Sequence, residues 1–313
     1  MAYYGRRNLA HKLNEKEERR RRYLSLDKDS AWYDVNLSLI GSLDLRSSFV
    51  KLNFDAETSD FIENAYHLSN SVCLQLFYNI CHTVLSLFMK RTCINGLLNR
   101  GSMFLFSQSN FQILFDKVIE KDGSLNISRI YNFKHDALDL GAGDGSITEK
   151  FAKKFGKIYA TEASSSMKRR LRNRGFFVFD DLDDWMSATY NFGSIFCLNL
   201  LDRHPTPVSL LKSLRQKMLE NGGFLYLAIV LPVSQYVEYQ SSKNKSLGNR
   251  PMEYIQTTNI RNFEQQLESF VDNVLKPLNF KILAWSRLPY LCEGDIWENF
   301  YILHDAIIVL KAV

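Results

Sequence analysis

The stretch ALDLGAGDGSITEKF at residues 137–151 combines three glycines with two acidic residues directly after a short apolar run. The glycines are Gly141, Gly143 and Gly145, and the acids are Asp139 and Asp144. A glycine-rich turn between a strand and a helix usually holds phosphate, because backbone N–H groups and the helix N-terminus favour an anion. Acids within the turn repel such an anion, so the turn is either only tight or binds a ligand that carries positive charge.

S-adenosyl-L-methionine suits this turn better than a dinucleotide does. A dinucleotide fingerprint requires a third glycine three residues after the second, where this chain has Ser146. S-adenosylmethionine has no phosphate but carries a sulfonium cation and an ammonium group, which Asp139 and Asp144 can face directly or through water. We therefore predict a cofactor site that includes Gly141 and Gly143, binds S-adenosyl-L-methionine and releases S-adenosyl-L-homocysteine.

A third acid, Glu162, ends the next predicted strand in the stretch IYATE. It follows the first glycine by about twenty residues, which is the separation expected of a carboxylate that binds the ribose hydroxyls. A strand, a DxGxGxG turn, a helix and a second strand that ends in an acid form a fairly specific combination. Asp180 and Asp181 follow the third predicted strand, where adenine is commonly bound in this fold, and we expect them near it.

Predicted strands and helices alternate from residue 136 onwards, which indicates an α/β fold with a doubly wound parallel sheet. The predicted strands lie at residues 137–140, 157–161, 176–179, 194–201, 224–232, 281–288 and 304–313. The predicted helices lie at residues 146–155, 164–175, 208–223 and 262–276. In a seven-stranded sheet of this kind the ligand binds outside the carboxyl ends of the strands, where the glycine turn lies.

The excess of positive charge lies at the N-terminus. The whole chain has 39 Lys and Arg against 34 Asp and Glu, and residues 1–30 alone hold nine of the former and five of the latter. We expect residues 1–55 to form a solvated basic tail and an irregular lead-in, with an anionic partner or a targeting role as the alternative. Residues 56–115 are expected to form a helical N-terminal extension packed on the core, and residues 116–313 the domain that uses S-adenosylmethionine.

One apolar segment raises the question of a membrane. No charged side chain occurs between Glu63 and Lys90, and residues 71–89 are about long enough to span a bilayer. The segment also contains polar residues that would all need partners in lipid, namely Gln75, Asn79, His82 and Thr83. We therefore expect a buried helix packed on the main domain and no membrane span.

The cysteines and the N-terminus exclude some classes of protein. The five cysteines are odd in number and scattered, with no CxxC pair and no histidine at ligand spacing, so we expect neither a metal site nor a disulfide framework. The N-terminus has charge but no apolar core segment, which argues against a cleavable signal peptide. A cytoplasmic location is the expectation from these features.

Several further stretches resemble the DREV family of protein histidine methyltransferases. They are SLFMKRTCINGLLNRGSMFLFS, LDLGAGDG, YATE, CLNLLDR, AIVLP, RLPYLCEGD and YILHDAIIVLK. The resemblance covers residues 56–313, and its blocks outside the glycine turn are the specific ones. It implies a class I, Rossmann-like methyltransferase fold and transfer of a methyl group from S-adenosylmethionine to the pros (Nδ1) nitrogen of histidine in His-x-His motifs of other proteins.

The chemistry of imidazole requires an acid in such a site. Only the ring nitrogen with a free lone pair can attack the methyl carbon, so the enzyme must fix the tautomer. A carboxylate that accepts the N–H of the other nitrogen does this and stabilises the imidazolium that forms. The resemblance implies that this catalytic acid is Asp202 in CLNLLDR, at the mouth of the fourth strand; the alternative is that Asp202 caps the turn before Pro205.

The resemblance and the strand positions add five further site residues. Asn199 and Tyr290 are implied as cofactor contacts. Tyr301 opens the last strand near the site, and we expect it to have a catalytic role. Glu293 and Asp295 could hold a basic or imidazole-rich peptide substrate, with an exposed acidic hairpin as the alternative.

The chain contains no His-x-His motif of its own, so any such substrate is another protein. A nucleic-acid partner is not expected, because the body of the chain is near neutral and lacks an Asn-Pro-Pro-Tyr motif for base amines. Methylation of a small molecule or of RNA stays open as the alternative function. We expect a monomer, and the resemblance adds the endoplasmic reticulum and the mitochondrion as possible locations.

Overall fold

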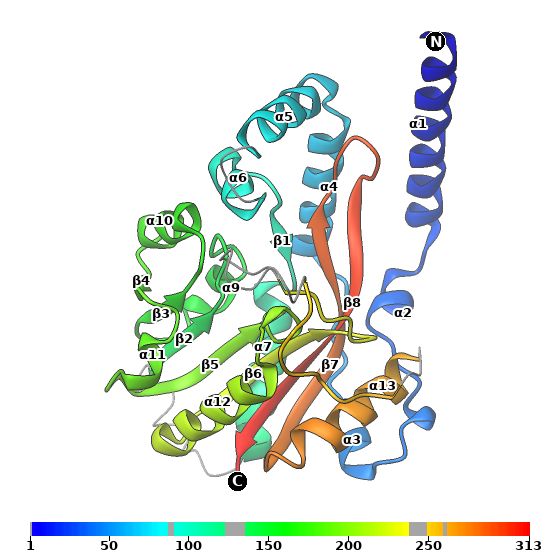
Figure 1. Cartoon of the computed structure of the whole chain (residues 1–313). Coiled ribbons are helices and arrows are strands. Elements are labelled where there is room, and N and C mark those ends of the chain that lie inside the picture. The colour runs from blue at the N-terminus through cyan, green and yellow to red at the C-terminus, as the bar shows by residue number, and fades with distance from the viewer. Residues whose placement is uncertain (1, 87–90, 123–134, 238–248, 259–261) are drawn as a thin grey trace.

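The computed structural model of the chain describes residues 2–86, 91–122, 135–237, 249–258 and 262–313. Its centre is one eight-stranded sheet with the strand order β1-β7-β8-β6-β5-β2-β3-β4 (Figure 1). The strands are β1 Met103–Phe104, β2 Asp136–Leu140, β3 Ile158–Thr161, β4 Phe177–Val178, β5 Phe192–Leu198, β6 Phe224–Val230, β7 Phe280–Glu293 and β8 Phe300–Ala312.

The sheet is mixed rather than parallel throughout. Strands β6, β5, β2, β3 and β4 run parallel, as the alternation with helices predicts. The last two strands form a hairpin in which β8 runs antiparallel to both β6 and β7. The short strand β1 joins the edge of β7, so the prediction of seven strands is one short. A two-residue strand has too little pattern to be recognised in the sequence.

Helices cover both faces of the sheet (Figure 1). The helices after residue 100 are α7 Gln108–Asp122, α9 Thr148–Ala152, α10 Ser165–Asn173, α11 Asp184–Ser187, α12 Pro207–Asn221 and α13 Phe263–Phe270, which continues as the π-helix η4 Val271–Leu275. Side chains alternate across β5: Ile195 and Cys197 face α12 and α13, whereas Phe196 stacks on Phe151 of α9 at 3.7 Å between ring centroids. The site therefore rests on a sheet that is packed on both sides.

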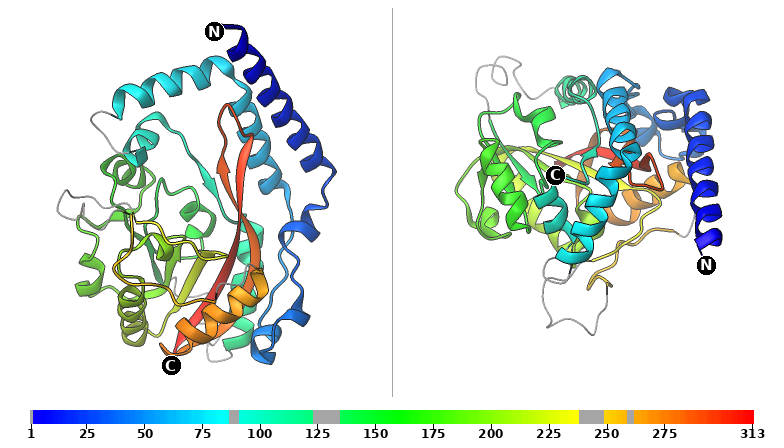
Figure 2. Two further views of the ribbon diagram at one scale, coloured as in Figure 1. Left: turned by 45° about the vertical axis from the view of Figure 1, so that its right-hand side comes forward. Right: turned by 90° about the horizontal axis from the view of Figure 1, so that it is seen from above.

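The N-terminal part of the chain is more ordered than the sequence suggests. It forms α1 Ala2–Ser25, α2 Lys28–Trp32, the 3-10 helix η1 Leu37–Leu39 and α3 Leu43–Ser47. Lys16 of α1 donates hydrogen bonds to the carbonyls of Ser69, at 3.0 Å, and Asp295, at 3.1 Å. Figure 2 shows α1 beside α4 and the β7–β8 hairpin. The expectation of an irregular lead-in is thus wrong, because these residues form helices and Lys16 of α1 binds other parts of the chain, although most of the described side chains of α1 are exposed to solvent.

The division of the chain into three parts stays a prediction, but one contact and the extent of one helix bear on where the parts meet. Val50 donates a backbone hydrogen bond to Trp285 of β7, which ties the N-terminal part to the sheet. Helix α7 runs through residue 115, so a boundary there divides a helix.

The helical extension consists of α4 Ala56–Asn70, α5 Val72–Leu85 and α6 Arg91–Leu98. The expectation of a buried helix is wrong for α5, because Leu76, Phe77 and Ile80 are each more than half exposed. The chain breaks helical geometry at Ser71, and residues 87–90 of the apolar segment lie outside the described residues. Within the described ranges, no helix combines the length and apolarity needed to cross a membrane.

Candidate active site

The glycine turn follows β2 and adopts a left-handed backbone at all three glycines, with φ of 68° at Gly141, 58° at Gly143 and 82° at Gly145. Its N–H groups already have acceptors: Gly141 donates to Thr161 Oγ1 at 3.2 Å and Gly143 to Glu162 Oε2 at 3.0 Å. A phosphate would have to displace these bonds. A Cβ at Gly143 would meet nothing within 4 Å, so a ligand can approach the backbone there.

Gly145 packs against the protein instead of facing open space. A Cβ there would lie 2.9 Å from Leu171 Cδ2 and 3.0 Å from Arg174 Cδ. We expect Gly145→Ala to lower the free energy of unfolding by about 1–3 kcal/mol for backbone strain, with a further loss from crowding. Urea unfolding measures this loss.

Gly175 provides the matched control, because its φ is 85° and a Cβ there would meet nothing within 4 Å. Gly175→Ala is expected to lower the free energy of unfolding only by the cost of backbone strain. Equal losses for the two variants would show that Leu171 and Arg174 absorb the added methyl group.

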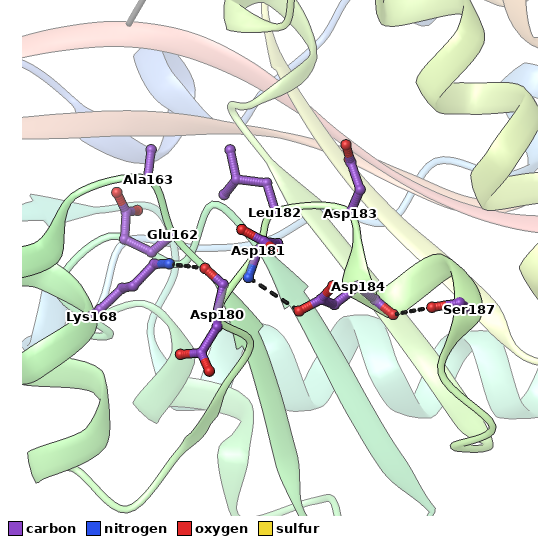
Figure 3. Close-up of a pocket in the computed structure, with 9 residues that line it drawn as sticks. All are labelled: Glu162, Ala163, Lys168, Asp180, Asp181, Leu182, Asp183, Asp184 and Ser187. Atoms are coloured by element: carbon purple, nitrogen blue, oxygen red, sulfur yellow. Dashed lines mark hydrogen bonds between the residues drawn. The ribbon is translucent and has the colours of Figure 1, made fainter.

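Glu162 joins the glycine turn to a pocket. Its carboxylate is 8% exposed and accepts N–H bonds from Gly143 and, at 2.8 Å, from Ser164. The pocket has a volume of about 630 Å³ and is shown in Figure 3. Its lining residues are Glu162, Ala163, Lys168, Asp180, Asp181, Leu182, Asp183, Asp184 and Ser187. The structure thus brings together Glu162, Asp180 and Asp181, as the sequence predicts, although an adenine contact of the two aspartates stays a prediction.

The two acids of the turn have structural partners. Asp139 is buried and accepts a hydrogen bond from Thr148 Oγ1 at 2.6 Å. Burial, together with the charge of Glu162, raises the pKa of Asp139 to about 7, so this carboxyl holds a proton for much of the time at neutral pH. Asp144 accepts from the N–H of Ser146 at 3.0 Å and from its hydroxyl at 2.9 Å. Both acids shape the turn, and their contact with a cofactor stays a prediction.

A group of buried polar side chains lies at the carboxyl end of β5. Asn199 has a φ of 54° and donates from Nδ2 to Asp305 Oδ2 at 2.6 Å. Asp202, in the 3-10 helix η2 Leu201–Arg203, is 2% exposed, and its Oδ2 lies 3.3 Å from Nε of Arg203. Three oxygens of this group are buried without a hydrogen-bond partner among the described residues: Asn199 Oδ1, Asp202 Oδ1 and Asp305 Oδ1.

This group lies next to the glycine turn. Strands β2 and β5 are parallel neighbours in which Leu140 pairs with Cys197, so their carboxyl ends meet. A Cβ on Gly141 would lie 3.1 Å from Leu200 Cδ1. The turn and these polar side chains are therefore neighbours at the carboxyl edge of the sheet, and a ligand that supplies hydrogen-bond donors or positive charge would suit the buried acceptors.

The capping alternative for Asp202 finds no support in the described residues. Neither η2 nor α12 has a side-chain capping bond from Asp202, and the N–H of Thr206 instead donates to His204 Nδ1 at 3.1 Å. The backbone carbonyl of Asp202 accepts from the N–H of Tyr236, and the carbonyl of Pro205 accepts from the N–H of Met252. The described parts of the segment that follows β6 therefore pack on the loop that holds Asp202.

Tyr290 on β7 comes close to this group. Burial raises the pKa of its hydroxyl well above the usual value, and the nearby Cys292, Asp305 and Asp202 side chains raise it further. Its hydroxyl also contacts Met103 Sδ of β1. Tyr290 thus lies near enough to Asp202 for the charge of that acid to affect its hydroxyl, and a cofactor contact of Tyr290 stays a prediction.

The acids at the tip of the β7–β8 hairpin accept hydrogen bonds from neighbouring residues. Glu293 is buried and accepts from the N–H groups of Gly101, at 3.0 Å, and Ser102, at 3.2 Å, so an exposed acidic hairpin is wrong for this residue. Asp295 accepts from the N–H of Trp297 and from the hydroxyl of Tyr301, both within 2.9 Å. The structure thus pairs Tyr301 with Asp295, and the catalytic and substrate-binding roles expected of these residues stay predictions.

Sequence reasoning missed Asp305. This residue lies in β8, opposite Val230 of β6 and Leu288 of β7, and is fully buried. An acid within the otherwise apolar run HDAIIVLK is the signal that could have singled it out. The sequence could not show that its partner is Asn199, which lies 106 residues earlier.

Comparison with known protein families decides the assignment of the chain. The model of the DREV methyltransferase family matches residues 32–312. The chain belongs to this family. The match begins before residue 56, where the resemblance in the sequence begins, and includes α3 and the last residue of α2.

Two solved methyltransferases are similar to this DREV methyltransferase in fold. One is magnesium protoporphyrin IX methyltransferase from Synechocystis PCC 6803 with bound S-adenosylhomocysteine, at 13% identity, 72% coverage of this chain, 88% of that chain and a TM-score of 0.36. The other is an S-adenosylmethionine-dependent methyltransferase from Clostridium acetobutylicum ATCC 824, at 15% identity, 65% coverage of this chain, 98% of that chain and a TM-score of 0.34.

The family and the strand order confirm the predicted fold class and cofactor: this DREV methyltransferase has the class I methyltransferase fold and uses S-adenosylmethionine. The residues present fit this cofactor. Buried acceptors without donors suit its ammonium and sulfonium groups, and the N–H groups of Gly141 and Gly143, already bonded, suit a ligand without phosphate.

Proposed function

We propose that this DREV methyltransferase methylates the pros nitrogen of histidine in His-x-His motifs of other proteins, as its resemblance to methyltransferase-like protein 9 implies. The observation that carries the proposal is the carboxyl group of Asp202, which is buried beside the glycine turn and has one oxygen, Oδ1, without a hydrogen-bond partner among the described residues. An acceptor of this kind matches the N–H of an imidazole ring.

Asp202 can perform two tasks for an imidazole. By accepting the N–H of the tele nitrogen, it holds the ring in the tautomer whose pros nitrogen has the lone pair. As that nitrogen gains the methyl group, the ring becomes positive, and a nearby carboxylate stabilises the charge that develops. When bound, S-adenosylmethionine supplies a methyl group whose carbon such a lone pair can attack, and the sulfur to which the methyl group is bonded is the leaving group.

The remaining residues of the site have proposed roles in holding the cofactor. Glu162, fixed by the N–H groups of Gly143 and Ser164, is placed to accept the ribose hydroxyls. Asn199, at the carboxyl end of β5, and Tyr290, near Asp202, are proposed to contact the methionine part. Asp139, Asp144, Gly141 and Gly143 form the turn against which the cofactor rests.

The substrate is tested with tritiated S-adenosylmethionine and two peptides that differ only in having His-x-His or Ala-x-Ala. We expect label in the first peptide alone, and two-dimensional NMR of the product is expected to show the methyl group on the pros nitrogen. Equal labelling of both peptides, a methyl group on the tele nitrogen, or transfer only to RNA or metabolites would contradict the proposal.

The rate is expected to rise with pH. A protonated imidazole has no lone pair to give, so a substrate histidine becomes reactive as pH passes its reference pKa of about 6.5. Burial raises the pKa of Asp202 above its usual value. Because Asp202 is proposed to act as a carboxylate that accepts a hydrogen bond from the ring, its ionisation also makes the methylation rate rise with pH. A rate profile between pH 5 and 9 that stayed flat would contradict this prediction.

A further inference from the structure

Asp305 is a buried acid without a partner of opposite charge. It lies in the middle of the sheet, between β6 and β7, and is fully buried. None of the ion pairs formed by the described residues includes it, and its Oδ1 has no hydrogen-bond partner there. Burying such a group costs stability unless something else favours it. Its side chain accepts a hydrogen bond from Asn199 Nδ2 at 2.6 Å, and this bond indicates what favours the burial of Asp305.

That bond decides which end of the Asn199 amide faces the site. An amide has a donor end and an acceptor end, and the two exchange places when the group turns over. With Nδ2 held by Asp305, Oδ1 is left as a buried acceptor without a partner in the described residues. The next residue, Leu200, lies against Gly141, so Asn199 adjoins the residue that packs on the cofactor turn.

We infer that Asp305 is a positioning residue for the cofactor: it holds the amide of Asn199 so that Oδ1 is presented to the donor groups of S-adenosylmethionine. The inference rests on the proposed contact between Asn199 and the cofactor. It explains why an acid occupies an apolar strand and why Asn199 keeps a left-handed backbone, with its own N–H bound to the carbonyl of Ala228 at 3.0 Å.

The raised pKa of Asp305 suggests a matched control for the loss of its hydrogen bond with Asn199. Burial raises its pKa well above the usual value, and the nearby charge of Asp202 raises it further, against the opposing effect of the hydrogen bond from Asn199. A protonated aspartate and an asparagine have nearly the same shape and no charge, and each keeps an oxygen that can accept from Nδ2. Asp305→Asn therefore preserves the positioning bond, whereas Asp305→Leu keeps the volume and removes it.

The experiment measures S-adenosylmethionine affinity by calorimetry for four variants: Asp305→Asn, Asp305→Leu, Asn199→Ala and the double variant Asn199→Ala with Asp305→Leu. We expect Asp305→Asn to bind within about threefold of the unchanged protein and Asp305→Leu about tenfold or more weaker. In the Asn199→Ala background, Asp305→Leu is expected to have almost no further effect, because the group through which it acts is gone. Thermal unfolding without ligand reports separately on stability.

Three results would overturn the inference: normal affinity of Asp305→Leu, full additivity of the two changes, or a loss in Asp305→Asn as large as in Asp305→Leu. If Asn199→Ala binds the cofactor normally, the proposed contact of Asn199 fails, and the inference fails with it. If Asn199→Ala binds weakly but Asp305→Leu binds normally, the contact stands and only the inference fails.

An exchange variant provides a test should Asp305→Leu fail to fold. Asn199→Asp alone places two acids face to face, and we expect weaker cofactor binding. Asn199→Asp combined with Asp305→Asn reverses donor and acceptor, so the bond forms again and an oxygen at position 199 is still left as an acceptor. Recovery of affinity in the combined variant is expected, and its absence would overturn the inference.

Discussion

Asp202→Asn is expected to lower the single-turnover rate of methylation of a His-x-His peptide by about a hundredfold or more. The substitution keeps the shape of the side chain but removes its charge, and it can present an N–H where an acceptor is needed. Because Asp202 is proposed to act on the imidazole and not on the cofactor, the affinity for S-adenosylmethionine is expected to stay nearly unchanged. Rapid-quench methylation with saturating cofactor measures the rate, and calorimetry measures the affinity.

Asp272→Asn is the control for a change of one aspartate. Asp272 is a half-exposed acid in η4 that pairs with Lys276, and its change is expected to leave the rate unaltered. A wild-type rate in Asp202→Asn would contradict the proposed role of Asp202. A variant that has lost only cofactor affinity would contradict it as well. The orienting acceptor would then have to be sought elsewhere, with Glu293 and Asp295 as the next candidates.

Glu162→Ala is expected to weaken S-adenosylmethionine binding by about a hundredfold. Hydrogen bonds that involve a charged group contribute about 1.5–3 kcal/mol each, and a ribose offers two hydroxyls to this carboxylate. The structure adds a second reason, because the same carboxylate holds the N–H groups of Gly143 and Ser164. Calorimetric titration with S-adenosylmethionine measures the loss of affinity.

Two variants help to separate the causes of that loss. Glu162→Gln keeps the size of the side chain and one acceptor oxygen, so we expect a smaller loss than for alanine. Glu120→Ala removes an acid on α7 that is 70% exposed and pairs with Lys117, and it is expected to bind the cofactor normally. Unchanged affinity in Glu162→Ala would contradict the ribose assignment.

The acids around the site differ in what they can offer to a ligand. Asp139 and Asp144 are bonded to Thr148 and Ser146, and Glu293 is bonded to backbone N–H groups. Asp202 and Asp305 each have a buried oxygen without a hydrogen-bond partner in the described residues, and so does Glu293, whose Oε1 lies 3.9 Å from Nε of Arg100. Buried acceptors of this kind suit a cationic or donor-rich ligand.

The sequence by itself determined the order of the strands and long helices after residue 136, the glycine turn and the place of Glu162, but not the short helices α11 and η2. These features depend on local patterns: an apolar run predicts a strand, glycines with acids predict the turn, and an acid at the end of the next strand lies beside that turn because neighbouring parallel strands end at the same edge. The structure places the N–H of Gly143 on the carboxylate of Glu162, in agreement with that prediction.

Only the tertiary structure decided which side chains meet across long separations. The hydrogen bond from Asn199 to Asp305 depends on β8 lying beside β6, and the pairing of Glu293 with residues 101 and 102 depends on β1 joining the edge of β7. The order of α1 depends on contacts with the hairpin more than 270 residues away. The physical reason is the same in each case: strand register and packing fix these partners, and register follows from the assembled sheet rather than from the residues of any one segment.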